Sequence, residues 1–126
     1  MYQIKEVTKT ESLTTLGASA FEGCTALESI VIPGSVTHIS EGAFALCSAL
    51  ASIVVDSKNI AYDTRENCNA LIETSTNTLI RGCENSVIPN GVKRIAKGAF
   101  SLLPITSIKI PNSVTSIGYH AFHGCD

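Results

Sequence analysis

Tryptophan is absent from this 126-residue chain, and aromatic residues make up only 6% of it. Hydrophobic residues nevertheless reach 44%. A core of this composition is filled by isoleucine, valine, leucine and alanine with a few phenylalanines, which suits thin stacked layers better than a thick globule. We therefore expect a single domain built from layers.

Strong charge and long apolar runs are also missing. The net charge is −2, which gives no electrostatic basis for binding nucleic acid or an anionic membrane. No apolar run approaches the roughly 20 residues that span a bilayer. The start, Met1–Glu6, lacks the basic-then-apolar design of a secretion signal. The sequence predicts either a cytoplasmic protein or a piece of a longer exported chain.

A segment of about 23 residues recurs along the chain and decides the fold. Phe44 follows Phe21 by 23 residues, and Phe122 follows Phe100 by 22, each phenylalanine directly after an alanine. A proline stands six residues before three of the repeat-opening isoleucines, at Pro33, Pro89 and Pro111. Each copy predicts a brief β-strand, a proline-containing turn, and an Ala-Phe segment that forms a single helical or 3-10 turn.

The repeat divides the single domain, 1–126, into coils at 1–15, 16–38, 39–94, 95–116 and, incomplete, 117–126. The first coil lacks the proline, but aligning Leu16 with Ile39 places Val7 over Ile30. The third coil is too long by about ten residues. Its two strand-like runs predict an inserted β-hairpin near 69–81. We expect this hairpin at the rim, because a loop cannot sit inside a layer that stacks on both sides.

Residues 16–38 read Leu-Gly-x-x-Ala-Phe-x-x-Cys-x-x-Leu-x-x-Ile-x-Ile-Pro-x-x-Val-x-x. This pattern resembles the BspA-like class of bacterial leucine-rich repeats, and the likeness extends over almost the whole chain. The resemblance implies an α/β-type solenoid, a right-handed superhelix of short parallel strands with short helical or 3-10 turns. It also implies a cell-surface or secreted location and a role in adhesion and protein–protein contact.

A single coil cannot bury its own apolar edge, so each coil must stack on its neighbours. We expect the apolar residues of the second coil and its neighbour to point inward: Leu27, Ile30, Ile32, Val36, Ile39 and Phe44. Equivalent positions predict two vertical ladders. They are Phe21, Phe44, Phe100 and Phe122, and Ile32, Val55, Ile88 and Ile110.

Strand alternation predicts a set of residues that face outward on the concave sheet and form a binding face. They are Glu28, Ser29, Val31, Ala51, Ser52, Val54, Glu84, Asn85, Val87, Thr106, Ser107 and Lys109. This face is mildly polar and nearly neutral, and it lacks the tryptophan, tyrosine and arginine anchors that dominate tight interfaces. Weak or avidity-dependent binding is the expectation.

The five cysteines suggest packing more than chemistry. Cys24, Cys47 and Cys125 share one repeat position, which favours small buried fillers. Cys68 and Cys83 flank the hairpin and could bridge, although free thiols are the favoured interpretation. No Cys-x-x-Cys pair is present, so we expect no metal.

Nothing in the sequence indicates an enzyme. His38, His120 and His123 fall at variable repeat positions and are expected to face solvent. No serine or cysteine has a matched histidine and acid in a distinctive motif, and the glycines form no phosphate loop. We expect no catalytic residues and no cofactor.

The leading hypothesis is a non-catalytic interaction or adhesion module whose partner is a host or bacterial surface or matrix protein. The alternatives are a structural spacer that binds nothing and a cytoplasmic scaffold. The last residues, Gly124-Cys125-Asp126, follow an Ala-Phe pair with no capping coil. Because solenoid ends need caps, the sequence predicts a truncated segment or end-to-end self-association.

Overall fold

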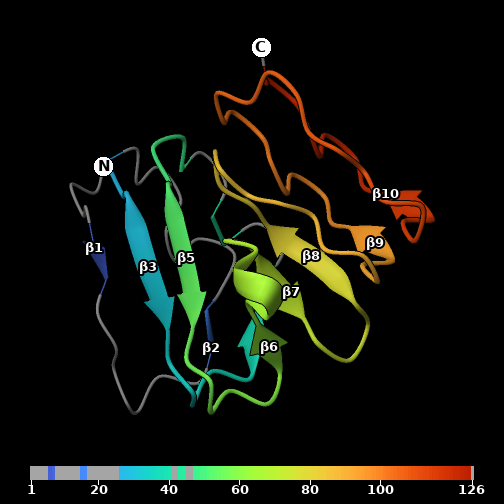
Figure 1. Cartoon of the computed structure of the whole chain (residues 1–126). Coiled ribbons are helices and arrows are strands. Elements are labelled where there is room, and N and C mark those ends of the chain that lie inside the picture. The colour runs from blue at the N-terminus through green and yellow to red at the C-terminus, as the bar shows by residue number, and fades with distance from the viewer. Residues whose placement is uncertain (1–5, 8–14, 17–25, 41–42, 45–46, 126) are drawn as a thin grey trace.

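The computed structural model describes residues 6–7, 15–16, 26–40, 43–44 and 47–125. Parallel strands one repeat apart lie side by side (Figure 1). One sheet has the order β1 (Glu6–Val7), β3 (Ser29–Ile32), β5 (Ser52–Val55), and a second pairs β2 (Thr15–Leu16) with β4 (His38–Ile39). The registers place Val7 beside Ile30 and Leu16 beside Ile39. The alignment of the first two coils is therefore confirmed.

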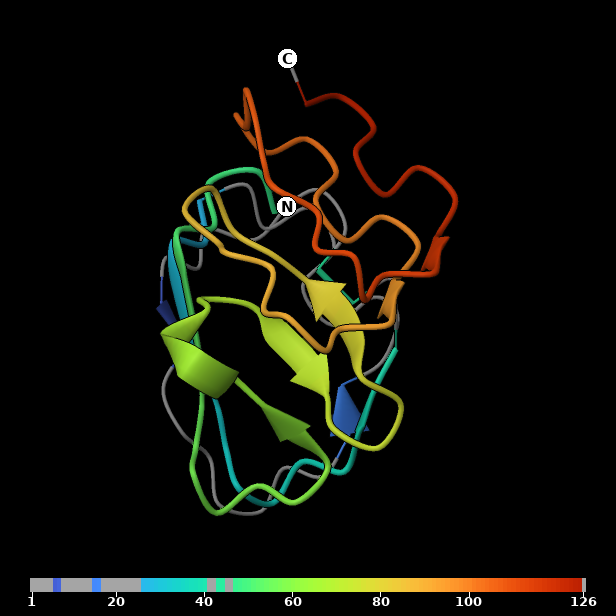
Figure 2. The ribbon, with the colours of Figure 1, turned by 45° about the vertical axis from the view of Figure 1, so that its right-hand side comes forward.

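The remaining strands form one five-stranded sheet of order β10-β9-β8-β7-β6. Its members are β6 (Tyr62–Asp63), β7 (Leu71–Glu73), β8 (Thr78–Arg81), β9 (Arg94–Ile95) and β10 (Ser116–Ile117). Strands β6, β7 and β8 pair antiparallel, whereas β8, β9 and β10 are parallel. Figure 2 shows β6, β7 and β8 side by side in this layer.

The predicted hairpin is present as β7 and β8, but its expected place at the rim is wrong. All four residues of β8 are buried, and Leu71 and Ile72 of β7 are fully buried. The two strands stand between β6 and β9 in the sheet, so they occupy the stack itself. Their alternate residues face apolar neighbours on both sides, and each strand supplies the hydrogen bonds that the next one needs.

The described Ala-Phe segments form single turns with the hydrogen-bond spacing of a 3-10 turn, and none of them continues into a helix. The N–H groups of Ala43, Ala99 and Ala121 each donate to the carbonyl three residues earlier. Left-handed residues at Leu102 (φ 63°) and His120 (φ 57°) interrupt any continuation. Within the described ranges, the helical structure is the three-residue 3-10 helix η1 (Arg65–Asn67).

Two apolar clusters make up the core. The inward-facing set expected from the second and third coils is buried in the first cluster, which holds Ile30, Ile32 and Phe44. The second cluster contains Ile88, Phe100 and neighbours from the later coils. Of the aliphatic ladder, Ile32 lies beside Val55 in register, but Ile110 is 41% exposed. Among the described residues, Ile110 belongs to neither cluster.

The expected phenylalanine column is interrupted between Phe44 and Phe100. The rings of Phe100 and Phe122 stack in parallel, with centroids 5.2 Å apart and an interplanar angle of 3°. Phe44 belongs to the other cluster, and the buried Arg81 lies between the two layers. Its Nη2 donates to the carbonyl of Cys47 (3.2 Å) and its Nη1 to that of Gly98 (2.9 Å).

Strand β8 thus adds a layer between those of Phe44 and Phe100. This layer contains Arg81 and Gly82 in place of a phenylalanine. Gly82 contacts Phe100 so closely that an added Cβ would lie 1.9 Å from the ring. The position of Phe21 falls outside the described residues, so this part of the column stays a prediction.

Candidate functional site

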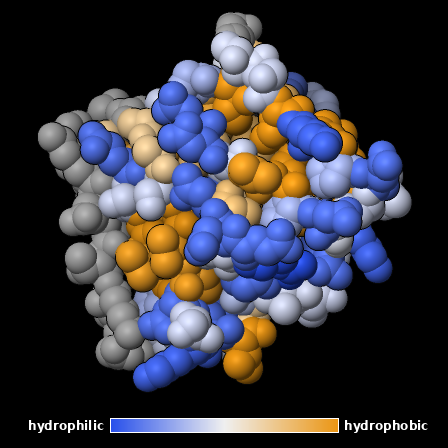
Figure 3. All heavy atoms as spheres, viewed as in Figure 1, coloured by the Kyte–Doolittle hydropathy of each residue, from blue (hydrophilic) through white to orange (hydrophobic). Residues whose placement is uncertain are grey.

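The predicted binding residues of the second and third coils lie on one surface. Ser29 pairs with Ser52 and Val31 with Val54 in the parallel register of β3 and β5. Val31 is 38% and Val54 49% exposed, and both serines are half-buried. We call these four residues the valine face. Figure 3 shows a hydrophobic patch over these strands, with hydrophilic residues below it and on the side toward the later coils.

The predicted residues from later coils are exposed but do not extend this sheet. Glu84, Asn85 and Val87 lie in a turn and an irregular segment. Thr106, Ser107 and Lys109 are also exposed, in an irregular segment with a bend at Thr106. The two remaining members of the set, Glu28 and Ala51, are exposed directly before β3 and before β5. The predicted face is therefore a sheet surface only over β3 and β5.

An inserted layer explains why the predicted residues of the later coils do not extend the sheet of β3 and β5. The N–H of Val87 donates to the carbonyl of Cys68 (3.0 Å), and the Ser86 hydroxyl donates to the carbonyl of Asn69. Asn69 in turn bonds β5, so residues 68–69 separate β5 from the segment around Val87. Alignment of the repeats in the sequence predicts instead that these two segments are neighbours.

A hollow of about 530 Å³ opens beside β5. Its lining comes from two stretches of chain, and it consists of residues 51–57, 59, 62–65, 67 and 69. We call it the β5 hollow. Ser52 and Val54 of the valine face belong to its lining, and the segment that contains η1 forms the other side. Figure 1 shows η1 in front of the sheet, next to β5.

Side chains, not a strand, close the free edge of β5. The N–H of Ile53 donates to Oδ1 of Asn69 (2.9 Å), whose Nδ2 donates to the carbonyl of Ala51 (2.9 Å). The N–H of Val55 donates to the Thr64 hydroxyl (2.7 Å). The Asn69 amide thereby replaces one pair of ladder hydrogen bonds, and the edge is protected from pairing with another strand.

Left-handed backbone shapes the wall of the hollow. Glu66, Asn67 and Asn69 have φ values of 57°, 53° and 59°. Asparagine tolerates this conformation better than most residues, while glutamate does so at some energetic cost. Such local strain persists only where surrounding contacts hold the backbone in place. It occurs often in functional loops.

An ion pair anchors this wall. Nε and Nη2 of Arg65 donate to the two carboxylate oxygens of Asp63, each at 2.8 Å, and Nη1 donates to Asn77 (2.7 Å). Burial raises the pKa of Asp63, but hydrogen bonds from Arg65 and Thr74 outweigh it and hold this pKa below its ordinary value. The carboxylate therefore stays ionised and keeps η1 beside β5.

The buried tyrosine behind the hollow has a related structural role. The N–H of Ile39, on β4, donates to the Tyr62 hydroxyl at 2.7 Å. Burial raises the pKa of Tyr62 above its ordinary value. The phenol therefore stays neutral and satisfies a strand-edge N–H that no strand reaches.

The cysteines and histidines form no reactive centre among the described residues. Cys47, Cys68 and Cys83 are buried, and burial raises the pKa of Cys83 to about 12. Cys68 and Cys83 do not bridge. The rings of His120 and His123 are 4.5 Å apart on the surface, but no group of three potential metal ligands occurs in the described ranges. Cys24 lies outside them.

The sequence did not single out the residues that build the wall. Thr64, Asn67 and Asn69 look like ordinary loop residues, and only the density of asparagine and other polar residues around η1 signals left-handed turns.

None of the helical structure in the described ranges has the length and apolar character needed to cross a membrane.

The repeat and its stacked parallel strands are matched among known proteins. Residues 1–81 and 80–126 match the BspA type leucine rich repeat region, in six copies. The chain belongs to this family.

Solved structures of bacterial leucine-rich repeat proteins have a similar fold. One from Eubacterium ventriosum has a TM-score of 0.81 at 27% identity, over 98% of this chain and 33% of the other. A leucine rich cell surface protein from Faecalibacterium prausnitzii has a TM-score of 0.72 at 31% identity, over 96% of this chain and 39% of the other. This chain thus spans between a third and two fifths of their lengths. A search of curated proteins finds no match.

Proposed function

We propose that this chain is a non-catalytic protein-interaction module of a bacterial surface repeat protein, and that the valine face and the β5 hollow form its contact surface. The observation behind the proposal is the juxtaposition of exposed valines with a hollow of about 530 Å³. Exposed apolar groups with a polar border are typical of interaction sites. Family membership and the cell-surface neighbour support the location.

The arrangement of the parallel layers fits a segment of a right-handed solenoid that serves adhesion. Stacked coils hold β3 and β5 rigidly from behind through Ile30, Ile53 and their neighbours, which are buried. A rigid surface loses little conformational entropy when it binds. The partner is a host or bacterial surface or matrix protein.

Binding of the full chain to an array of matrix and bacterial surface proteins tests this proposal. We expect a saturable signal that Val54→Lys weakens and Ile117→Lys leaves intact. The two positions are matched, because Val54 is 49% and Ile117 50% exposed and each lies in a strand. A spacer gives no saturable signal, and a contact surface elsewhere makes both variants bind like the wild type.

A further inference from the structure

Two histidines stand on either side of an Ala-Phe pair in the turn that follows β10. His120 directly precedes Ala121, and His123 directly follows Phe122. Ala121 is buried, and the ring of Phe122 stacks on that of Phe100. Because this pair is held in the stack, the residues beside it are turned outward, and both histidines are exposed.

The turn brings the two imidazole rings together. The N–H of His123 donates to the carbonyl of His120 (3.1 Å). This is the spacing of a 3-10 turn, in which side chains three residues apart lie on the same side. The ring centroids are accordingly 4.5 Å apart, with an interplanar angle of 69°. The metal-binding histidines of an α-helix are four residues apart, so His-x-x-His is their counterpart in this tighter turn.

The neighbouring coil holds the backbone of the turn in place. The N–H of Phe100 donates to the carbonyl of Ala121 (2.7 Å), and the N–H of Leu102 donates to the carbonyl of His123 (2.8 Å). Two side chains on such a fixed turn lose little conformational entropy when both bind the same ligand.

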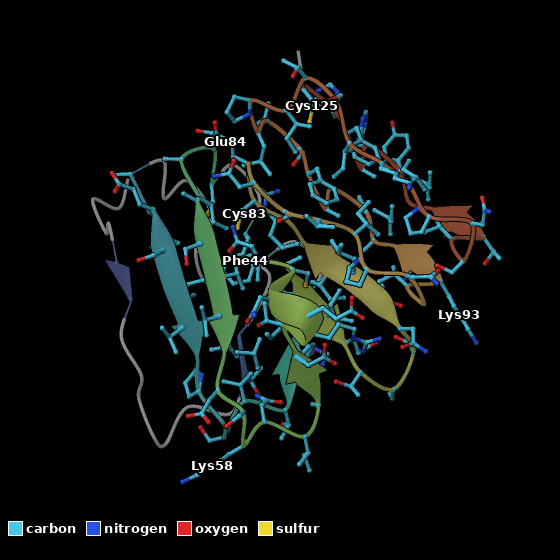
Figure 4. The ribbon with its side chains drawn as sticks, viewed as in Figure 1. Phe44, Lys58, Cys83, Glu84, Lys93 and Cys125 are labelled. Carbon is cyan, nitrogen blue, oxygen red and sulfur yellow. The ribbon has the colours of Figure 1, made fainter. Side chains whose placement is uncertain are left out.

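The turn presents imidazole groups to solvent, while the nearby thiol is engaged in the stack. Figure 4 shows Cys125 at the C-terminal end of this coil, and its thiol donates to the carbonyl of Phe100 in the neighbouring coil (2.8 Å). In that coil, Gly98 and Ser101 occupy the repeat positions of the two histidines. The fold therefore does not require an imidazole at either position.

The separation of the rings fits one shared metal ion. Imidazole nitrogen binds zinc at about 2.0–2.1 Å, and copper and nickel also favour this ligand. Two rings that share such an ion have centroids roughly 4.5–5 Å apart, and the observed 4.5 Å agrees with this separation. Exposed side chains rotate within nanoseconds, so one nitrogen of each ring can turn toward the ion.

We propose that His120 and His123 bind one divalent transition-metal ion of the kind that prefers imidazole, such as Ni²⁺, Cu²⁺ or Zn²⁺. Each histidine supplies one ring nitrogen, and water takes the remaining positions, as in other sites with open coordination positions. The expectation of no metal rested on the missing cysteine pairs, whereas this site depends on a histidine pair. It includes no residue of the valine face or the β5 hollow, so it does not depend on the function proposed above.

Isothermal titration calorimetry of the full chain, without a histidine tag, with Ni²⁺ tests the proposal. We expect one Ni²⁺ bound per chain, and no binding of Mg²⁺, which prefers oxygen ligands. His120→Asn and His123→Gln should each raise the Kd for Ni²⁺ at least about tenfold, because even the loss of a group that supports a ligand costs roughly 10–100-fold. Asparagine tolerates the left-handed backbone of position 120 (φ 57°). His38→Gln is the control, because this third histidine of the chain is also exposed, and it should leave the Kd unchanged.

Equal Kd values for the wild type and both turn variants would overturn the proposal, because the ion would then bind elsewhere. An equal rise for His38→Gln, or no binding of Ni²⁺ by the wild type up to about 1 mM, would overturn it as well. Thermal unfolding shows whether each variant is folded. An NMR titration of the wild type requires no variant: paramagnetic Ni²⁺ should broaden the amide signals of residues 119–124 first, and broadening centred elsewhere would contradict the site.

Discussion

Gly82→Ala should destabilise the protein by about 3 kcal/mol, the upper part of the range for overpacking a core. The added Cβ would lie 1.9 Å from Cε1 of Phe100 and 2.5 Å from Cδ1 and Cζ. Carbon atoms prefer a separation of about 3.5–4.0 Å, so the ring must move by more than an ångström. Phe122 stacks on the same ring with a centroid separation of 5.2 Å, which limits its retreat.

Urea unfolding of single and double variants measures this effect. Phe100→Ala alone should cost about 3–5 kcal/mol. In the double variant the new methyl group occupies the vacated space, so Gly82→Ala should add almost nothing to that cost. Gly34→Ala is the control, because the nearest atom to its Cβ would be Cβ of Lys58, at 3.2 Å, and the next nearest would lie at 3.6 Å. Wild-type stability of Gly82→Ala, or additive costs in the double variant, would refute the packing between the layers.

Three further predictions concern groups that the fold buries or pairs. Tyr62→Phe leaves the buried N–H of Ile39 without its acceptor, so it should lower the free energy of unfolding by about 1–3 kcal/mol in urea titrations. Tyr119→Phe, at a 70% exposed site, should leave the free energy of unfolding unchanged. The folded-state pKa of Asp63 is lowered, so its stabilisation is present above its unfolded pKa and is lost as the pH falls through the folded pKa; the stability gap to Asp63→Asn should therefore narrow below about pH 4. Burial raises the pKa of Cys83 to about 12, so mass spectrometry should find its alkylation only under unfolding conditions; rapid labelling of the native protein would contradict its burial.

The register of the early coils could be predicted because identical residue types recur at one spacing. Val7 beside Ile30 and Leu16 beside Ile39 follow from that spacing alone. The hairpin β7–β8 was also predictable from its two strand-like runs. Its place inside the sheet was not, because Arg81 in β8 indicates an exposed position by its charge.

Arg81 is buried because turn carbonyls from two layers converge on it, including those of Cys47 and Gly98. Such an arrangement joins residues far apart in the sequence, so no local pattern signals it. The same limit applies to the proposed contact surface. The exposure of Val31 and Val54 follows from strand alternation, whereas the hollow depends on Asn69, whose side chain closes the edge of β5 from 16 residues away.

We propose that a protein partner contacts the valine face and the β5 hollow. An NMR titration of the isotope-labelled chain with a protein ligand from the array locates this contact. We predict that the largest amide shift changes fall within 29–32, 52–57 and 63–69. Changes concentrated in residues 105–125, with these segments unaffected, would contradict the claim.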